Sequence, residues 1–115
     1  MVNTHSVKDH MVYNDESFVK KILHSDRNIL SFVLNFKVGQ ILPRHDHEQS
    51  TLMLFVLKGK GEARVNDVSY QLSQGTVLKA DGPDVFAIPK VEEDMSVLVH
   101  LGPNPSNEIY ALDIG

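Results

Sequence analysis

The chain has 115 residues, 42% of them hydrophobic, which is enough apolar material for one core and leads us to expect a single domain over residues 1–115. It contains no cysteine, so disulfides, thiolate metal sites and a cysteine nucleophile are excluded. With a net charge of −4, no basic stripe and no apolar run long enough to span a bilayer, it is expected to bind neither nucleic acid nor a membrane.

The first 28 residues are expected to supply N-terminal edge strands. Residues 1–13 are polar and lack the apolar stretch of a signal peptide, which together with the absence of cysteine favours a cytoplasmic protein. Between residues 15 and 25 the apolar positions fit either an amphipathic helix capped by Asp15 or a twisted edge strand. The strand is favoured because the segments that follow are all β in character.

The core of the predicted fold lies at residues 29–101, where apolar side chains recur at every second position. Segments 30–36, 68–72 and 95–101 show this alternation, which is typical of a strand with one buried face. Segment 51–57 is apolar on both faces, as expected for a central strand. Many short strands separated by turn residues predict a sandwich or a barrel.

Glycine, asparagine and proline mark the expected turns. Asn66-Asp67 suits a two-residue hairpin, residues 58–61 are expected to follow the end of the central strand, and Pro89 is expected to break the later part of the chain. The connections are too short for crossovers, so neighbouring strands should be antiparallel. The tail, residues 102–115, could form a final edge strand or pack against a partner subunit.

The clearest chemical signal is the sequence Gly39-Gln-Ile-Leu-Pro-Arg-His45-Asp-His47. Two histidines two positions apart on a strand project to the same face, so both rings can approach one metal ion. Neutral imidazole is the most common protein ligand for metals. A pair with this spacing also arises often by chance, so the surrounding sequence determines how strongly the pair indicates a metal site.

The same stretch, continued to Gly59, resembles the first motif of the cupin superfamily: a glycine, five residues, H-x-H, a spacer, a carboxylate, six residues and a glycine. Residues 75–85 are similar to the second motif, which runs from a glycine through P-x-G to a histidine. The resemblance covers roughly residues 30–101. It implies an all-β, antiparallel, double-sheet barrel of the jelly-roll-like cupin type, with a metal or ligand inside it and a tendency to form homodimers.

The chain departs from the family pattern at two of the four metal-ligand positions. The carboxylate position falls on Leu52, or on Thr51 with the shorter spacing, and the histidine position of the second motif falls on Val85. Only His45 and His47 remain. Because a catalytic metal site typically has three protein ligands and an exchangeable water, we expect at most one weakly bound divalent transition metal.

A third metal ligand could come from His100 or Gln49. His100 lies in segment 95–101 and faces either the barrel interior or the outer surface, where it would be exposed or at a dimer contact. Gln49 has the strand parity of His47 and could reach the mouth of the cavity. No catalytic residue can be assigned from spacing.

Three functional hypotheses follow. The barrel could bind a small, largely apolar molecule, because the two replaced ligands turn a polar metal cavity into an apolar one. It could instead be a metal-dependent enzyme, such as a dioxygenase, isomerase or decarboxylase, that uses His45, His47 and an unrecognised ligand, or a barrel kept only for its dimer interface. The sequence identifies neither ligand nor substrate. The pocket residues expected for the first hypothesis are Phe36, His45, His47, Leu52, Leu54, Val85 and His100.

Overall fold

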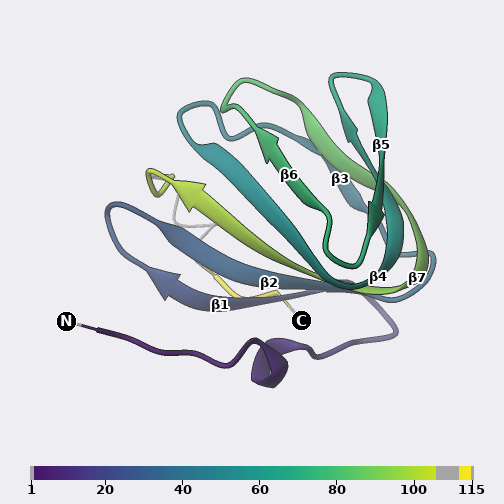
Figure 1. Ribbon diagram of the computed structural model, residues 1–115, viewed down its shortest axis with the longest axis horizontal. Coiled ribbons are helices and arrows are strands. Elements are labelled where there is room, and N and C mark those ends of the chain that lie inside the picture. The colour runs from purple at the N-terminus through teal and green to yellow at the C-terminus, as the bar shows by residue number, and fades with distance from the viewer. Residues whose placement is uncertain (1, 106–111, 115) are drawn as a thin grey trace.

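A computed structural model describes residues 2–105 and 112–114, and in this part of the chain nearly all regular structure is antiparallel β-sheet (Figure 1). The all-β expectation is confirmed. Among the described residues, no helix has the length and apolar character needed to cross a membrane. In chain order the elements are the 3₁₀ helix η1 (Val7–His10) and the strands β1 (Val19–Ser25), β2 (Leu30–Phe36), β3 (Leu42–His45), β4 (Thr51–Val65), β5 (Val68–Ser73), β6 (Val77–Ala80) and β7 (Phe86–Gly102).

The strands form two layers that share their two longest members. Strands β1 and β2, the second half of β7, the first half of β4, and β6 pair side by side in one layer. The other layer contains β3, the first half of β7, the second half of β4, and β5. The ladders do not close into a ring, but the bent long strands wrap both layers around one interior, as Figure 1 shows.

The bends of β4 and β7 correct two expectations from the sequence. Residues 58–61 do not follow the end of the central strand, and Pro89 does not break the chain, because β4 continues to Val65 and β7 runs from Phe86 to Gly102. The β4–β7 register shifts repeatedly between Val56 and Arg64, and Gly59 has a φ of +91°. Glycine and register shifts bend a strand while most of its pairing continues, so the same residues that suggested a turn form a corner.

Other expectations agree with the structure. The segment with ambiguous spacing contains strand β1, not a helix. Asn66 and Asp67 have φ values of 50° and 68° and join a pair of strands that begins at Val65 and Val68, as a two-residue hairpin requires. In the tail, Ile114 forms a β-bridge with Lys20, while residues 106–111 lie outside the described part of the chain.

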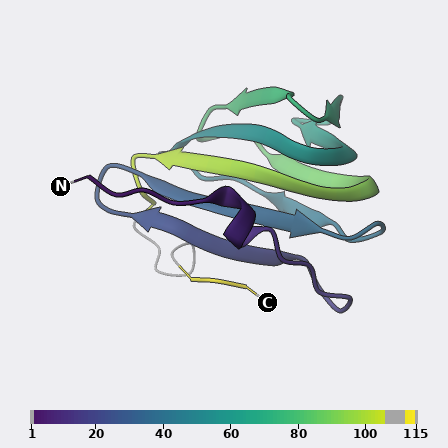
Figure 2. The same cartoon turned by 60° about the horizontal axis from the view of Figure 1, so that its bottom comes forward.

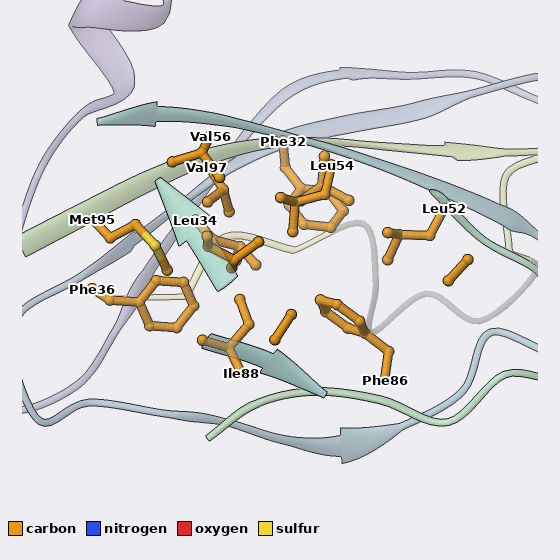
Figure 3. Packing of buried hydrophobic residues seen from close by; sticks show 14 of the residues in the cluster. Phe32, Leu34, Phe36, Leu52, Leu54, Val56, Phe86, Ile88, Met95 and Val97 are labelled. Carbon is orange, nitrogen blue, oxygen red and sulfur yellow. The ribbon is translucent and has the colours of Figure 1, made fainter. Parts of the chain in front are cut away.

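The core lies between the two layers. Alternate residues of β2, β4 and the second half of β7 face inward and meet Phe86 and Ile88 of the opposite layer (Figure 3). Phe36 and Leu54 are completely buried there. Each apolar side chain removed from water contributes roughly 1.5–3 kcal/mol, so this cluster is the main source of stability.

The outward face of the first layer is partly covered by the N-terminal segment, which crosses it in Figure 2. Tyr13 Oη donates to Ser96 Oγ at 2.6 Å, and Ser96 Oγ donates to Asn35 Oδ1 at 2.7 Å. The Asn35 side-chain amide donates to the carbonyl oxygen of His10 at 2.8 Å. Because Asn35 and Ser96 are fully buried, these bonds satisfy polar groups that water cannot reach and hold the segment in place.

Candidate functional site

His45 is the last residue of β3 and pairs with Phe86 of β7. Its Nδ1 lies 2.8 Å from the carbonyl oxygen of Pro43. A carbonyl only accepts, so Nδ1 carries the hydrogen and, in the neutral ring, Nε2 keeps its lone pair. The Phe86 ring meets the imidazole edge to face, with ring centroids 5.9 Å apart, and thereby fixes one side of the histidine.

His47 lies beyond the end of β3, so the expectation that both histidines occupy one strand is wrong. The loop that carries it is held by two backbone bonds: the His47 amide donates to Gly82 O at 3.2 Å, and the Ser50 amide donates to His47 O at 2.8 Å. A side chain at Gly82 would have no room, because its Cβ would lie 2.1 Å from Glu48 O. This packing brings the two imidazoles together, with centroids 4.6 Å apart and planes at 84°.

The two histidines line a pocket of about 260 Å³ between the first layer and β3. Among the described lining residues most are apolar, and the polar side chains are basic or imidazole. The lining residues are Phe18, Lys20, Phe32, Leu34, Leu42, Pro43, Arg44, His45, His47 and Ile114.

Lys20 of β1 is a pocket residue that no sequence motif singled out. It is only 5% exposed, and its Nζ lies 4.5 Å from the centroid of the Phe32 ring. Burial lowers the pKa of Lys20 to about 8, while the negative charge of Asp113 acts in the opposite direction. Strand alternation could have identified Lys20 in the sequence. Lys20 and Ile22 lie on the same face of β1, and Ile22 packs against the core, so an apolar residue is expected at position 20.

Most of the other predicted pocket residues lie elsewhere. Phe36, Leu52 and Leu54 face the interior but are packed within the core cluster (Figure 3). Val85 is in the loop before β7, where its amide donates to Asn66 Oδ1 at 3.0 Å, and Phe86 stands beside His45 instead.

The proposed third metal ligands are not brought to the histidine pair. His100 pairs with Ser31 and Met53, on the face of the sheet opposite to the core, and its Nδ1 lies 2.6 Å from Ser31 Oγ. Gln49 is exposed in the turn after His47. Strand alternation alone does not determine which face of the sheet His100 occupies. Because Val99 and Leu101 point into the core, His100 lies on the opposite face.

Among the described residues, the pocket supplies fewer ligands than a catalytic metal site typically has. Within residues 2–105 and 112–114, no group of three His, Cys, Asp or Glu side chains is placed to hold an ion. If two imidazoles were its only protein ligands, an ion would be coordinated mainly by water. The positive charge of Lys20 is also close enough to disfavour protonation of His47, and it would oppose a metal cation in the same way.

The pKa of His47 is lowered from 6.5 to about 4, first by burial and then by the charge on His45, with Asp46 opposing and Lys20 assisting. Between these two pH values the unfolded chain binds a proton that the folded chain does not, so stability should fall as the pH falls. After a discount for solvent screening we expect a loss of about 1–2 kcal/mol. Urea unfolding of the wild type and of His47→Gln at pH 7 and pH 4.5 measures it.

The variant should show a shallower pH dependence than the wild type, by about the same 1–2 kcal/mol. His5→Gln, which removes an exposed histidine of the N-terminal segment, should keep the wild-type dependence. Parallel curves for the wild type and His47→Gln would contradict a half-buried His47 with a lowered pKa.

The fold agrees with comparisons to known proteins. Residues 32–99 match the family model described as Cupin domain, and the chain therefore belongs to the cupin family. It is similar to the crystal structure of an RmlC-like cupin protein from Desulfovibrio desulfuricans, with 30% identity, a TM-score of 0.81, and coverage of 90% of this chain and 98% of that one. No match was found among curated proteins.

Two further structures show the same fold at lower identity. TT1209 from Thermus thermophilus is 22% identical with a TM-score of 0.84, over 90% of this chain and 100% of that one. KdgF from Halomonas sp. is 19% identical with a TM-score of 0.79, over 92% of this chain and 97% of that one. At these identities the likeness concerns the barrel and not its chemistry.

Proposed function

We propose that the protein is a small-molecule-binding cupin whose ligand occupies the pocket beside His45 and His47. The observation that supports this most is the composition of the pocket: apolar and aromatic walls surround a few polar groups, which is the usual make-up of an organic ligand site. The two imidazoles then serve as hydrogen-bonding groups that orient the ligand. His45 accepts through Nε2, because its Nδ1 is engaged with Pro43.

A second depression, of about 550 Å³, lies along the β4–β5 hairpin and β6. Its charged groups already have partners within the protein. Lys79 Nζ lies 2.8 Å from Asp81, and Asp84 accepts from the Asn66 side chain and the Asp81 amide, at 2.8 Å each. A ligand there would have to compete with these contacts, so the smaller pocket is the better candidate.

A matched pair of variants tests the proposed site. Leu42→Trp fills the pocket, whereas Ile41→Trp places the same ring on the preceding exposed residue, outside the pocket lining. We expect indole and toluene to bind the wild type weakly, and Leu42→Trp to reduce their affinity about tenfold or more, while Ile41→Trp retains it. NMR titration measures both. Equal binding by the two variants would place the ligand elsewhere.

The metal-dependent enzyme remains the alternative, and elemental analysis distinguishes it. Untagged protein should carry well below one equivalent of any transition metal, because two imidazoles alone hold an ion weakly. A near-stoichiometric metal that is lost in the His45→Ala/His47→Ala double variant would favour the enzyme and overturn our proposal. Homodimer formation, expected from the family resemblance, stays a prediction that sedimentation equilibrium would check.

A further inference from the structure

The edge strands of the fold differ in how they are protected against pairing with another chain. In the described part of the chain, β1, β3, β5 and β6 each pair with a single strand, so each has one edge outside the ladders (Figure 1). Proteins commonly protect such edges with charged residues or proline. β1 carries Lys20 and Lys21, β3 carries Pro43 and Arg44, and β6 carries Lys79. β5, with the sequence Val-Ser-Tyr-Gln-Leu-Ser, has no charged residue, proline or glycine.

The outer edge of β5 presents backbone groups at two positions. Val68 follows a two-residue turn, so it exchanges both of its backbone bonds with β4. Bonded pairs alternate along an antiparallel ladder, and the amide and carbonyl groups of Ser69 and Gln71 therefore point away from β4. The outward amide of Ser73 donates to Thr76 Oγ1 at 3.2 Å. Within the described residues, Ser69 and Gln71 thus offer two donors and two acceptors to an incoming strand.

The surface beside this edge has room for another strand. The depression of about 550 Å³ runs along β5, and Val68 and Tyr70, both exposed, lie in its wall. They share the face of β5 that Leu72 turns into the core, so this apolar face is covered at one end and uncovered at the other. A strand that pairs through its backbone need not displace the internal partners of Lys79 and Asp84.

The sequence of β5 is complementary to itself in antiparallel pairing. With a two-fold axis beside Tyr70, Ser69 of each copy lies opposite Gln71 of the other, and the outward backbone groups of both residues are bonded. The apolar face then places Tyr70 opposite Tyr70, and Val68 opposite Leu72. Aromatic and aliphatic pairs of this kind stabilise neighbouring strands.

The charges on the other face of the sheet favour the same register. Glu62 of β4 lies beside Gln71, and Arg64 lies beside Ser69. In the register centred on Tyr70, each row therefore runs from Glu62 of one copy to Arg64 of the other, and opposite charges share the row. A register centred on Gln71 would instead align Glu62 with Glu62, and Arg64 with Lys60, which is unfavourable.

We propose that β5 is a self-association edge, through which two copies of this chain pair as antiparallel strands about a two-fold axis. Each copy uses its own β5 edge, so the assembly closes as a dimer and does not grow into a filament. The proposal is independent of the ligand-binding function. A contact made by one short strand is small, so we expect a weak dimer, with a dissociation constant of roughly 0.1 mM. Unfolding measured well below that concentration reports the monomer.

Val68→Lys and Val38→Lys form a matched pair of variants. The two valines are 53% and 59% exposed, and only Val68 lies in β5. Val68→Lys would place an ammonium group against Leu72 of the second copy, and it should raise the dissociation constant of the dimer about tenfold or more. Val38→Lys should keep the wild-type value. Sedimentation equilibrium measures both, and circular dichroism checks that the variants are folded.

A single introduced cysteine tests the register, because the chain has none of its own. Residues directly opposite each other in a non-hydrogen-bonded antiparallel pair have Cα atoms about 4.5 Å apart, a separation that a disulfide can span. With oxidised glutathione, Tyr70→Cys should therefore form a cross-linked dimer much faster than Val38→Cys, which is exposed outside the proposed interface.

Several results would overturn the proposal. The wild type could remain monomeric well above the expected dissociation constant, or Val68→Lys and Val38→Lys could associate equally. Equal rates of cross-linking for Tyr70→Cys and Val38→Cys would exclude the antiparallel β5 pair. If the wild type stays monomeric while a synthetic peptide with the sequence of residues 67–73 shifts the NMR signals of the Ser69 and Gln71 amides, the edge accepts an extended peptide and not a second copy.

Discussion

Gly59→Ala is expected to lower the free energy of unfolding by about 3 kcal/mol or more. Gly59 has a φ of +91°, a conformation that costs an alanine energy wherever it occurs. An added Cβ would also lie 2.2 Å from Asp94 O and 2.7 Å from Met95 Cα. Both atoms belong to the backbone of β7 as it crosses β4, so neither can move aside without disturbing the corner that joins the layers.

Gly75→Ala separates the two contributions. Gly75 has nearly the same φ, +90°, but an added Cβ would meet nothing within 4 Å. Its substitution should therefore show only the conformational cost, about 1–2 kcal/mol. Urea unfolding followed by circular dichroism compares the variants with the wild type. Equal losses for Gly59→Ala and Gly75→Ala would show that the close approach of β4 and β7 is not important for stability.

Phe36→Ala should be similarly severe, with a loss of about 3–5 kcal/mol. The Phe36 side chain is 0% exposed and lies in the core cluster (Figure 3). Its ring contacts that of Phe18 at a centroid distance of 5.5 Å. Its removal would leave a cavity between the layers. A domain of this length has a total stability of roughly 6–17 kcal/mol, so the variant would lose a large fraction of it.

Tyr70→Ala is the matched aromatic truncation, because Tyr70 is 47% exposed on β5. It should change the free energy of unfolding by less than about 1 kcal/mol. Differential scanning calorimetry of Phe36→Ala, Tyr70→Ala and the wild type checks the contrast. A small effect at Phe36 would mean that the two layers can collapse into the vacated space, contrary to the close packing of the core.

The sequence allowed the prediction of the barrel because local patterns determine strands and hairpins. Alternation located β2, and the Asn66-Asp67 pair located a hairpin whose two positive φ values the structure confirms. The corner at Gly59 was misinterpreted as the end of a strand, because glycine favours a turn and a bend equally. Only the partner strand β7, distant in sequence, distinguishes the two.

The candidate site was predictable only in part. The H-x-H spacing identified His45 and His47, although a loop and not a strand brings His47 to the pocket. Lys20 and Phe86 could not be identified from motifs. Lys20 reaches the pocket through the pairing of β1 with β2, and Phe86 reaches His45 through the pairing of β3 with β7. Which side chains line a barrel is decided by contacts between strands that are far apart in the chain.

The sharing of β4 and β7 between both layers has a practical consequence. Because neither layer can lose these strands without opening the other, the molecule should melt in a single cooperative transition. A compound bound at one end of the barrel then protects all of it, and at a concentration one hundred times its dissociation constant it adds about 2.7 kcal/mol to the stability. Melting temperature therefore provides a simple signal with which a library of small molecules can be screened for binding.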